Sequence, residues 1–171
     1  MTTELFDRAL VEEAAKKSAL VWVRGAGEGS PERALWHVWH DGAVCVVGDG
    51  PGEQPLPGLA DGGRAVLTLR SKDKGGRLVS CHAAVAEVTA GTAAWDEAVG
   101  ELKGKRLNAA DGEAMPARWA RECRVLRLTP VGQALPPSSG DLAAVPSPTP
   151  ATTREPVPAA LPRLLLRRGR R

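Results

Sequence analysis

The sequence has no tyrosine and one phenylalanine, so five tryptophans supply nearly all of its aromatic side chains. It has three cysteines, Cys45, Cys81 and Cys123, and no two of them have the C-x-x-C spacing of zinc and thioredoxin-type sites. This pattern excludes a disulfide framework of the kind found in small secreted proteins. We therefore expect three reduced thiols that behave as small apolar side chains.

Long apolar runs are also missing. No stretch approaches the roughly 18 apolar residues that a membrane-spanning helix needs, and no basic segment followed by an apolar one opens the chain. These absences predict a cytoplasmic protein with no membrane span. Hydrophobic residues make up 43% of the 171 residues, which is ordinary for a globular protein and enough to form a core.

The net charge of +3 is unevenly distributed along the chain. Residues 133–171 carry +4, because six arginines there face only Asp141 and Glu155, and residues 1–132 carry −1. Residues 133–171 are also rich in Pro and Ala, which is typical of disorder. We predict a folded domain at residues 1–132, without the basic surface of a nucleic-acid-binding domain. The predicted tail at 133–171 has a basic end suited to weak contacts with nucleic acid or an acidic surface.

Residues 34–48 have the pattern of a β-hairpin. Asp41-Gly42 suits a two-residue type I′ turn, because both central residues of that turn need positive φ, and the turn places Trp39 opposite Val44. One face then carries Leu35, His37, Trp39, Val44 and Val46, and the other carries Trp36, Val38, His40, Cys45 and Val47. Both faces are largely apolar, which indicates a hairpin covered on both sides, as in a closed barrel or at an interface.

The rest of the chain alternates between short strand patterns and a few helices. Apolar periodicity and charge order predict helices at 3–17 and from Thr92 to Arg106, and a short helix that begins at Met115-Pro116. The remaining strands are predicted at 19–24, 64–70, 77–89 and 121–129, and Pro130 ends the last one. The fold class is therefore mainly β (α+β), with six antiparallel strands, an N-terminal helix and a helix before the last strand.

This order of elements resembles the split β-barrel of the pyridoxamine 5′-phosphate oxidase-like superfamily over residues 4–130. The strongest local match is residues 95–108, W-D-E-A-V-G-E-L-K-G-K-R-L-N, followed by 117–130, which ends in Leu-Thr-Pro. The resemblance implies a homodimer that binds FMN, or the deazaflavin F420, as an oxidoreductase-like protein of unknown substrate. A second interpretation is a barrel without a cofactor that acts as a dimeric binding or regulatory module.

The resemblance also implies positions for a phosphate site, at an Arg that begins the second strand and at a cation cluster after the third strand. Arg33 matches the first position. After Gly48 the sequence has two acids and no cation, so only backbone N–H groups of that Gly-rich loop are available to an anion. A substitute cluster exists at Arg70, Ser71 and Lys72, which either holds a phosphate or forms a solvated turn.

Histidine chemistry is limited by spacing. His37 and His40 point to opposite faces of a strand, and no Asp, Glu or Cys set joins them at metal-ligand spacing, so we expect no metal site. His37 or His82 remains a candidate haem ligand, the alternative being a buried, hydrogen-bonded strand residue. Trp36 or Trp39 is a candidate to stack on a flat ring, or else packs in the core. No catalytic motif is present, so the catalytic residues stay unknown.

Overall fold

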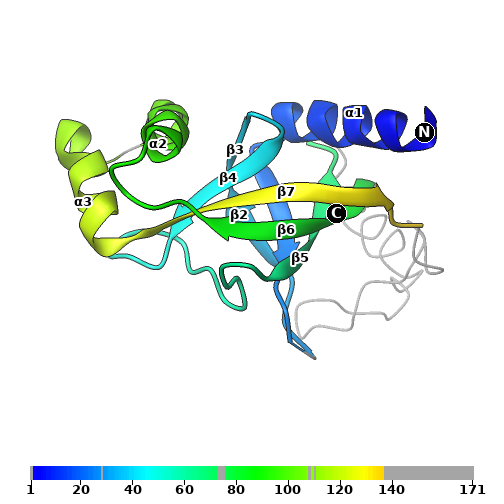
Figure 1. Ribbon diagram of the computed structural model, residues 1–171, viewed down its shortest axis with the longest axis horizontal. Helices are drawn as coiled ribbons and strands as arrows, with labels where there is room; N and C mark the ends of the chain where they lie inside the picture. Colours follow the sequence, from blue (N-terminus) through cyan, green and yellow to red (C-terminus); the bar gives the residue numbers. More distant parts are fainter. Residues whose placement is uncertain (1, 28, 73–75, 108, 110, 137–171) are drawn as a thin grey trace, which may run out of the picture.

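The computed structural model describes residues 2–136, except residues 28, 73–75, 108 and 110. In this part of the chain, seven antiparallel strands form one sheet in the order β2-β1-β5-β6-β7-β4-β3. Helix α1 runs along one side of the sheet, and α2 and α3 lie together at one end (Figure 1). The elements are α1 (Thr2–Lys17), β1 (Leu20–Arg24), β2 (Arg33–Trp36), β3 (Val38–His40), β4 (Ala43–Gly48), β5 (Arg64–Arg70), β6 (Arg77–Glu87), α2 (Ala93–Lys105), a 3-10 turn (Gly112–Ala114), α3 (Met115–Glu122) and β7 (Arg124–Ala134).

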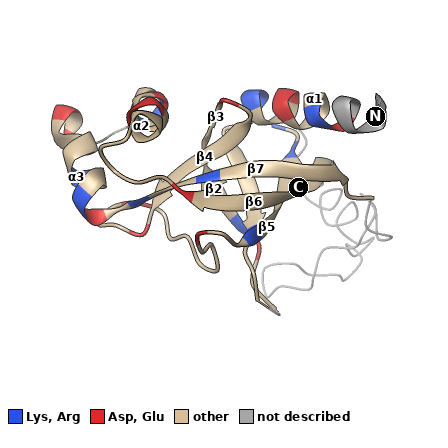
Figure 2. Ribbon diagram, viewed as in Figure 1, with Lys and Arg blue, Asp and Glu red and all other residues tan. Residues whose placement is uncertain are grey.

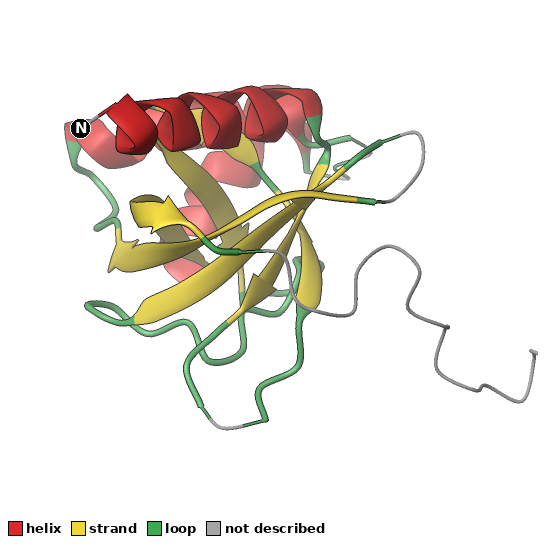
Figure 3. Cartoon of the chain, turned by 90° about the vertical axis from the view of Figure 1, so that its right-hand side faces the viewer, coloured by secondary structure: helices red, strands yellow, loops and turns green. Residues whose placement is uncertain are grey.

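The two edge strands of the sheet, β2 and β3, are joined by a single residue, His37. Because consecutive Cα atoms are only about 3.8 Å apart, the two edges must approach each other, and the sheet curls into a nearly closed barrel (Figure 3). Trp36 pairs with Leu20 of β1, whereas Val38 pairs with Cys45 of β4. The first hairpin strand is therefore split at His37, which is why the chain has seven strands and not the predicted six.

The turn and the register of the hairpin are confirmed. Asp41 and Gly42 have φ angles of 44° and 74°, as a type I′ turn requires, and Trp39 lies opposite Val44. The predicted division into two faces also holds, because the apolar side chains of the two sets belong to separate hydrophobic clusters. The positive φ of Asp41 is tolerated because Asp, with Asn, is among the few residue types other than glycine that adopt this region.

The first cluster fills the barrel and the second lies outside it. Val11, Ala14 and Ala15 of α1 cover the barrel interior, whereas α2 and α3 cover the outer face of β3, β4 and β7 with a set that includes the fully buried Trp119. Both faces of the hairpin are thus covered within one chain. Its two apolar faces are explained by the barrel and the helices, without an interface to a second copy.

The helices begin as the sequence predicts, but the last strand does not end as predicted. Thr92 caps α2 by accepting a hydrogen bond from the backbone N–H of Trp95, and Pro lies in the first turn of α3. Strand β7 continues through Pro130 to Ala134, so the prediction that Pro130 ends this strand is wrong. In the pairing with β6, Pro130 lies opposite Ala83, and the register shifts only after Val131, between the pairs His82–Val131 and Cys81–Ala134.

Most of the predicted tail, residues 137–171, lies outside the described residues. The domain boundary at 132/133 and the contacts of the basic end therefore stay predictions. Within residues 2–136, no helix of the described chain is long and apolar enough to span a membrane.

Candidate functional site

A pocket of about 420 Å³ lies where the C-terminal ends of α1 and α2 meet the barrel seam. The C-terminal end of α1 points toward α2 above the sheet (Figure 1). The volume of the pocket falls within the range of small-molecule sites. The pocket is lined by Lys16, Lys17, Ser18, Ala19, Leu20, Trp36, His37, Lys105, Arg106 and Leu107.

Four cationic side chains make this pocket positive. Lysines are favourable in the last turn of a helix, where the backbone carbonyls carry partial negative charge, and here two such turns face one pocket (α1 ends in blue in Figure 2). Lys16 and Lys17 form exposed ion pairs with Glu12 and Glu13, at 2.6 and 2.5 Å, and pairs of this kind are weak. Lys105 has no ion pair within the described residues, so its charge is available to a ligand.

The same pocket has an aromatic wall and apolar edges. The Arg106 guanidinium carbon lies 5.6 Å from the centre of the Trp36 ring. Leu20 and Leu107, which also line the pocket, are 48% and 75% exposed. Exposed apolar side chains beside cations fit a ligand that combines a flat apolar ring with an anionic group.

Beside Trp36, the candidate for stacking on a flat ring, this pocket is lined by the predicted site residue His37. It is 5% exposed, and its Nε2 lies 3.1 Å from the backbone oxygen of Ala15. Burial lowers the pKa of His37, against the effect of the Ala15 hydrogen bond, and the charge of Lys105 lowers it further. The ring is therefore neutral, with Nε2–H donating to Ala15. Its Nδ1 is buried and has no hydrogen-bond partner in the described chain.

The other two histidines lie elsewhere. The Nε2 of His40 is 3.5 Å from a carboxylate oxygen of Glu97 on α2, and His82 is exposed on β6. The three rings thus belong to different surroundings. Among the residues that the structure describes, no group of three His, Cys, Asp or Glu side chains is placed to hold a metal ion.

The predicted phosphate residues do not line the pocket. Arg33 is exposed at the start of β2, and Lys72 is exposed after β5. The backbone N–H of Ser71 donates to the Gly76 oxygen at 2.7 Å. The Ser18 hydroxyl, which is part of the pocket, donates to the backbone oxygen of Arg70 at 3.1 Å. The segment 70–72 is therefore a neighbour of the pocket, and its role in binding stays a prediction.

The side chain of Arg70 has partners within the chain. Its guanidinium lies 4.6 Å from the centre of the Trp22 ring, and its Nη2 is 3.3 Å from a carboxylate oxygen of Glu32. The Glu32 carboxylate thus partly offsets the charge of Arg70, one of the predicted cations.

Gly48 is enclosed by its own chain. A Cβ atom at this position would lie 2.1 Å from the backbone oxygen of Gln54 and 2.7 Å from Cγ of Leu56. The glycine is therefore required by packing. The two acids that follow it are also paired, since Asp49 lies 3.2 Å from Arg124 and Glu53 lies 3.0 Å from Arg118.

Sequence reasoning missed the lysines and the arginine of the pocket. Lys16, Lys17, Lys105 and Arg106 each have a sufficient local explanation as cations at a helix end. Only the approach of the two helix ends in space brings them together. Leu107, a large apolar residue directly after Lys105 and Arg106, was a signal present in the sequence, and the structure shows it 75% exposed.

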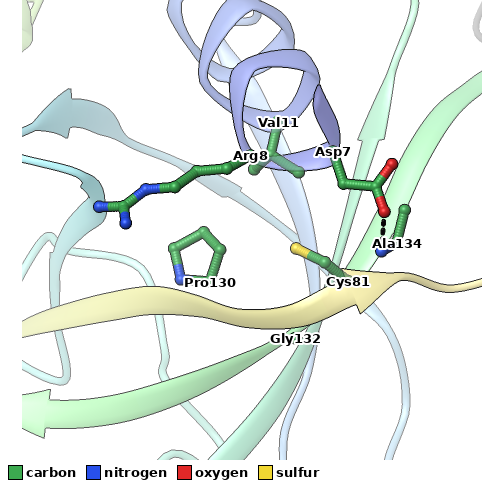
Figure 4. Close-up of a pocket in the computed structure, with 7 residues that line it drawn as sticks. All are labelled: Asp7, Arg8, Val11, Cys81, Pro130, Gly132 and Ala134. Carbon is green, nitrogen blue, oxygen red and sulfur yellow. Dashed lines mark hydrogen bonds between the residues drawn. The ribbon is translucent and has the colours of Figure 1, made fainter. Parts of the chain in front are cut away.

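Two other pockets are smaller. One, of about 180 Å³, lies between α1, the middle of β6 and the end of β7, where the Asp7 carboxylate accepts a hydrogen bond from the backbone of Ala134 (Figure 4). Burial raises the pKa of Cys81, in its wall, to about 11, so that thiol is protonated at neutral pH. The other, of about 320 Å³, includes Asp61 and Glu87. Neither combines cations with an aromatic side chain.

Several solved structures resemble this chain, among them the two that follow. The heme storage protein HutZ from Vibrio cholerae has a TM-score of 0.50 and 10% identity, over 73% of this chain and 90% of that one. The FAD binding protein from Mycobacterium smegmatis has a TM-score of 0.50 and 14% identity, over 72% and 89%. No family model and no curated protein matches the sequence. At this identity the likeness shows the fold, and the chain has the split β-barrel that the sequence predicted.

Proposed function

We propose that this chain binds a planar, anionic cofactor of the flavin type in the pocket between the ends of α1 and α2. The observation that carries the proposal is the combination in one pocket of an aromatic wall, exposed leucines and four cations. FMN is the first candidate and the deazaflavin F420 the second. The two structures of the same fold are described as heme storage and FAD binding proteins, which supports a flat anionic ligand.

The residues fit a flavin better than a haem. A haem iron takes an imidazole nitrogen as its axial ligand, and His37 is the histidine that lines the pocket. Its Nε2 is bonded to Ala15 and its Nδ1 is buried, so neither nitrogen is presented to a ligand. A flavin needs no such ligand. Trp36 and Arg106 would face the flavin ring. Lys105, with Lys16 and Lys17, would face the phosphate, and the redox chemistry would reside in the ring.

A titration with FMN and riboflavin tests the proposal, since riboflavin lacks the phosphate. We expect FMN to bind more tightly than riboflavin. We expect Lys105→Ala to weaken the affinity for FMN by about fivefold, with little effect on the affinity for riboflavin. Lys72→Ala is the matched control at the phosphate position predicted from the sequence. If Lys72→Ala weakens FMN and Lys105→Ala does not, the phosphate lies near Arg70 and Ser71, as first predicted. If neither flavin binds and F420 also fails, the cofactor-free module is the better account.

The proposal includes a homodimer. Leu20 and Leu78 are 48% and 52% exposed and lie on β1 and β6, strands that share one side of the barrel with β5. Light scattering during gel filtration would give twice the 18.0 kDa mass of one chain. A mass of one chain at micromolar concentration would contradict this part of the proposal.

A further inference from the structure

Glu53 lies in the loop after β4, and its side chain is fully buried, with 0% exposure. A buried carboxylate is costly unless charges and hydrogen bonds compensate it. One oxygen, Oε1, accepts hydrogen bonds from Nε1 of Trp119 and from Nη2 of Arg118, both at 3.0 Å. Both donors lie on α3, so this oxygen attaches the loop to the helix.

The second oxygen of Glu53 faces the pocket wall. Its Oε2 lies 3.3 Å from Nε of Arg106, and neither atom has a hydrogen-bond partner among the described residues. The remaining nitrogens of Arg106 donate to the backbone oxygens of Gly52 and Leu107, at 3.1 and 3.4 Å. Arg106 is thus held from several sides within the chain while its plane lies over Trp36.

The next residue, Gln54, holds Trp36 itself. The Gln54 side chain accepts from the Trp36 N–H at 2.9 Å and donates to the Trp36 oxygen, also at 2.9 Å. The ring of Trp36 in turn lies 6.3 Å from that of Trp119, with 40° between their planes. Two consecutive loop residues therefore fix both members of the pocket wall.

We propose that Glu53 is a positioning residue: its carboxylate holds the Arg106 guanidinium against Trp36, so that the pair presents a fixed, flat, cationic wall to the ring of a bound cofactor. The identity of that ligand rests on the proposed function, whereas the arrangement of the wall does not. The nitrogens of Arg106 interact with groups of the chain itself, so Arg106 would contact the ring of the ligand with the face of its guanidinium group. Lys105 and the lysines of α1 would then bind the anionic group of the ligand.

The first test needs no ligand. Acrylamide is an uncharged quencher, and the quenching of Trp36 is obtained by comparing the chain with its Trp36→Phe variant. In Glu53→Gln we expect the quenching of Trp36 to rise by about twofold, because the neutral amide removes the ion pair with Arg106 and the guanidinium leaves the ring. Glu113→Gln makes the same chemical change at a carboxylate that is 95% exposed, and we expect no rise there.

The second test is a double-mutant cycle with riboflavin, whose neutrality removes the effect of the changed charge. We expect Glu53→Gln and Arg106→Ala each to weaken the affinity for riboflavin by about fivefold. We expect the double variant to bind riboflavin no more weakly than Arg106→Ala alone. If the two effects multiply, Glu53 does not act through Arg106 and the inference is wrong. An unchanged Trp36 quenching in a folded Glu53→Gln variant would also overturn it.

Failure of the two proposals can be told apart. If the unaltered chain binds neither flavin, the proposed function fails, and the quenching experiment still decides the role of Glu53. If Glu53→Gln does not fold, Arg106→Lys takes its place, because it keeps the charge and leaves Glu53 with Arg118 and Trp119. A lysine has no planar group to cover the ring, so the quenching of Trp36 must rise in this variant for the inference to stand.

Discussion

Replacing Glu53 with alanine should destabilise the folded chain far more than its place in a loop suggests. The change removes both hydrogen bonds to Oε1 and the ion pair at Oε2. Arg118 keeps Asp111 at 2.6 Å and the Pro51 oxygen at 2.9 Å, so it is not left unpaired. Trp119 is fully buried, and its N–H would have no acceptor.

These losses can be given a magnitude. An unsatisfied buried donor costs about 1–3 kcal/mol, and removing one partner of a buried ion pair costs about 3–5 kcal/mol. Because Arg118 retains other acceptors, we expect the lower end, about 3 kcal/mol for Glu53→Ala. For a folded domain of this size, such a loss lowers Tm by about 10 °C.

Urea unfolding followed by far-UV circular dichroism measures this loss without depending on tryptophan fluorescence. Glu113→Ala is the control, because Glu113 also forms a 2.5 Å ion pair, with Lys103, but its side chain is 95% exposed. We expect no measurable change in that variant, since exposed ion pairs contribute little. Equal unfolding midpoints for the two variants would refute the assignment of a structural carboxylate to Glu53.

Three further predictions concern other parts of the fold. Gly48→Ala should lower the free energy of unfolding by about 2 kcal/mol or more, because its Cβ would meet a backbone oxygen at 2.1 Å. Gly100→Ala, in open space on α2, should instead raise it by about 0.5–1 kcal/mol. Urea unfolding compares the two variants. Burial lowers the pKa of His37 in the folded chain below its usual 6.5, so the unfolded chain takes up a proton first as the pH falls. The free energy of unfolding should therefore have its highest value above about pH 6.5 and decrease below it. His37→Gln should reduce the slope of stability against pH in melts from pH 5 to 8. Burial raises the pKa of Cys45 and Cys81 to about 11, so an aromatic disulfide reagent at pH 8 should react with neither until urea unfolds the chain. Because Cys123 is only half-buried, rapid reaction of more than one thiol in the native state would contradict the burial of the other two.

The parts of the fold that the sequence predicted are those with a local cause. The Asp41-Gly42 turn follows from the φ preferences of two residues, and the alternation of side chains around it then assigns each to one face. The start of α2 follows from the cap at Thr92. The split of the hairpin at His37 was missed, because the run around it continues to alternate while the barrel changes its pairing partner there.

The candidate site shows the opposite case. His37 and Trp36 were singled out from the sequence, and both line the pocket, but the pocket cations come from the ends of two helices that are far apart in the chain. The sequence by itself determined the hairpin, the helix starts and the cations of each helix end, because these depend on neighbouring residues. Only the tertiary structure decided that Lys17 and Lys105 face one pocket and that Glu53 meets Arg118, 65 residues away, because such contacts depend on how the closed barrel places its helices.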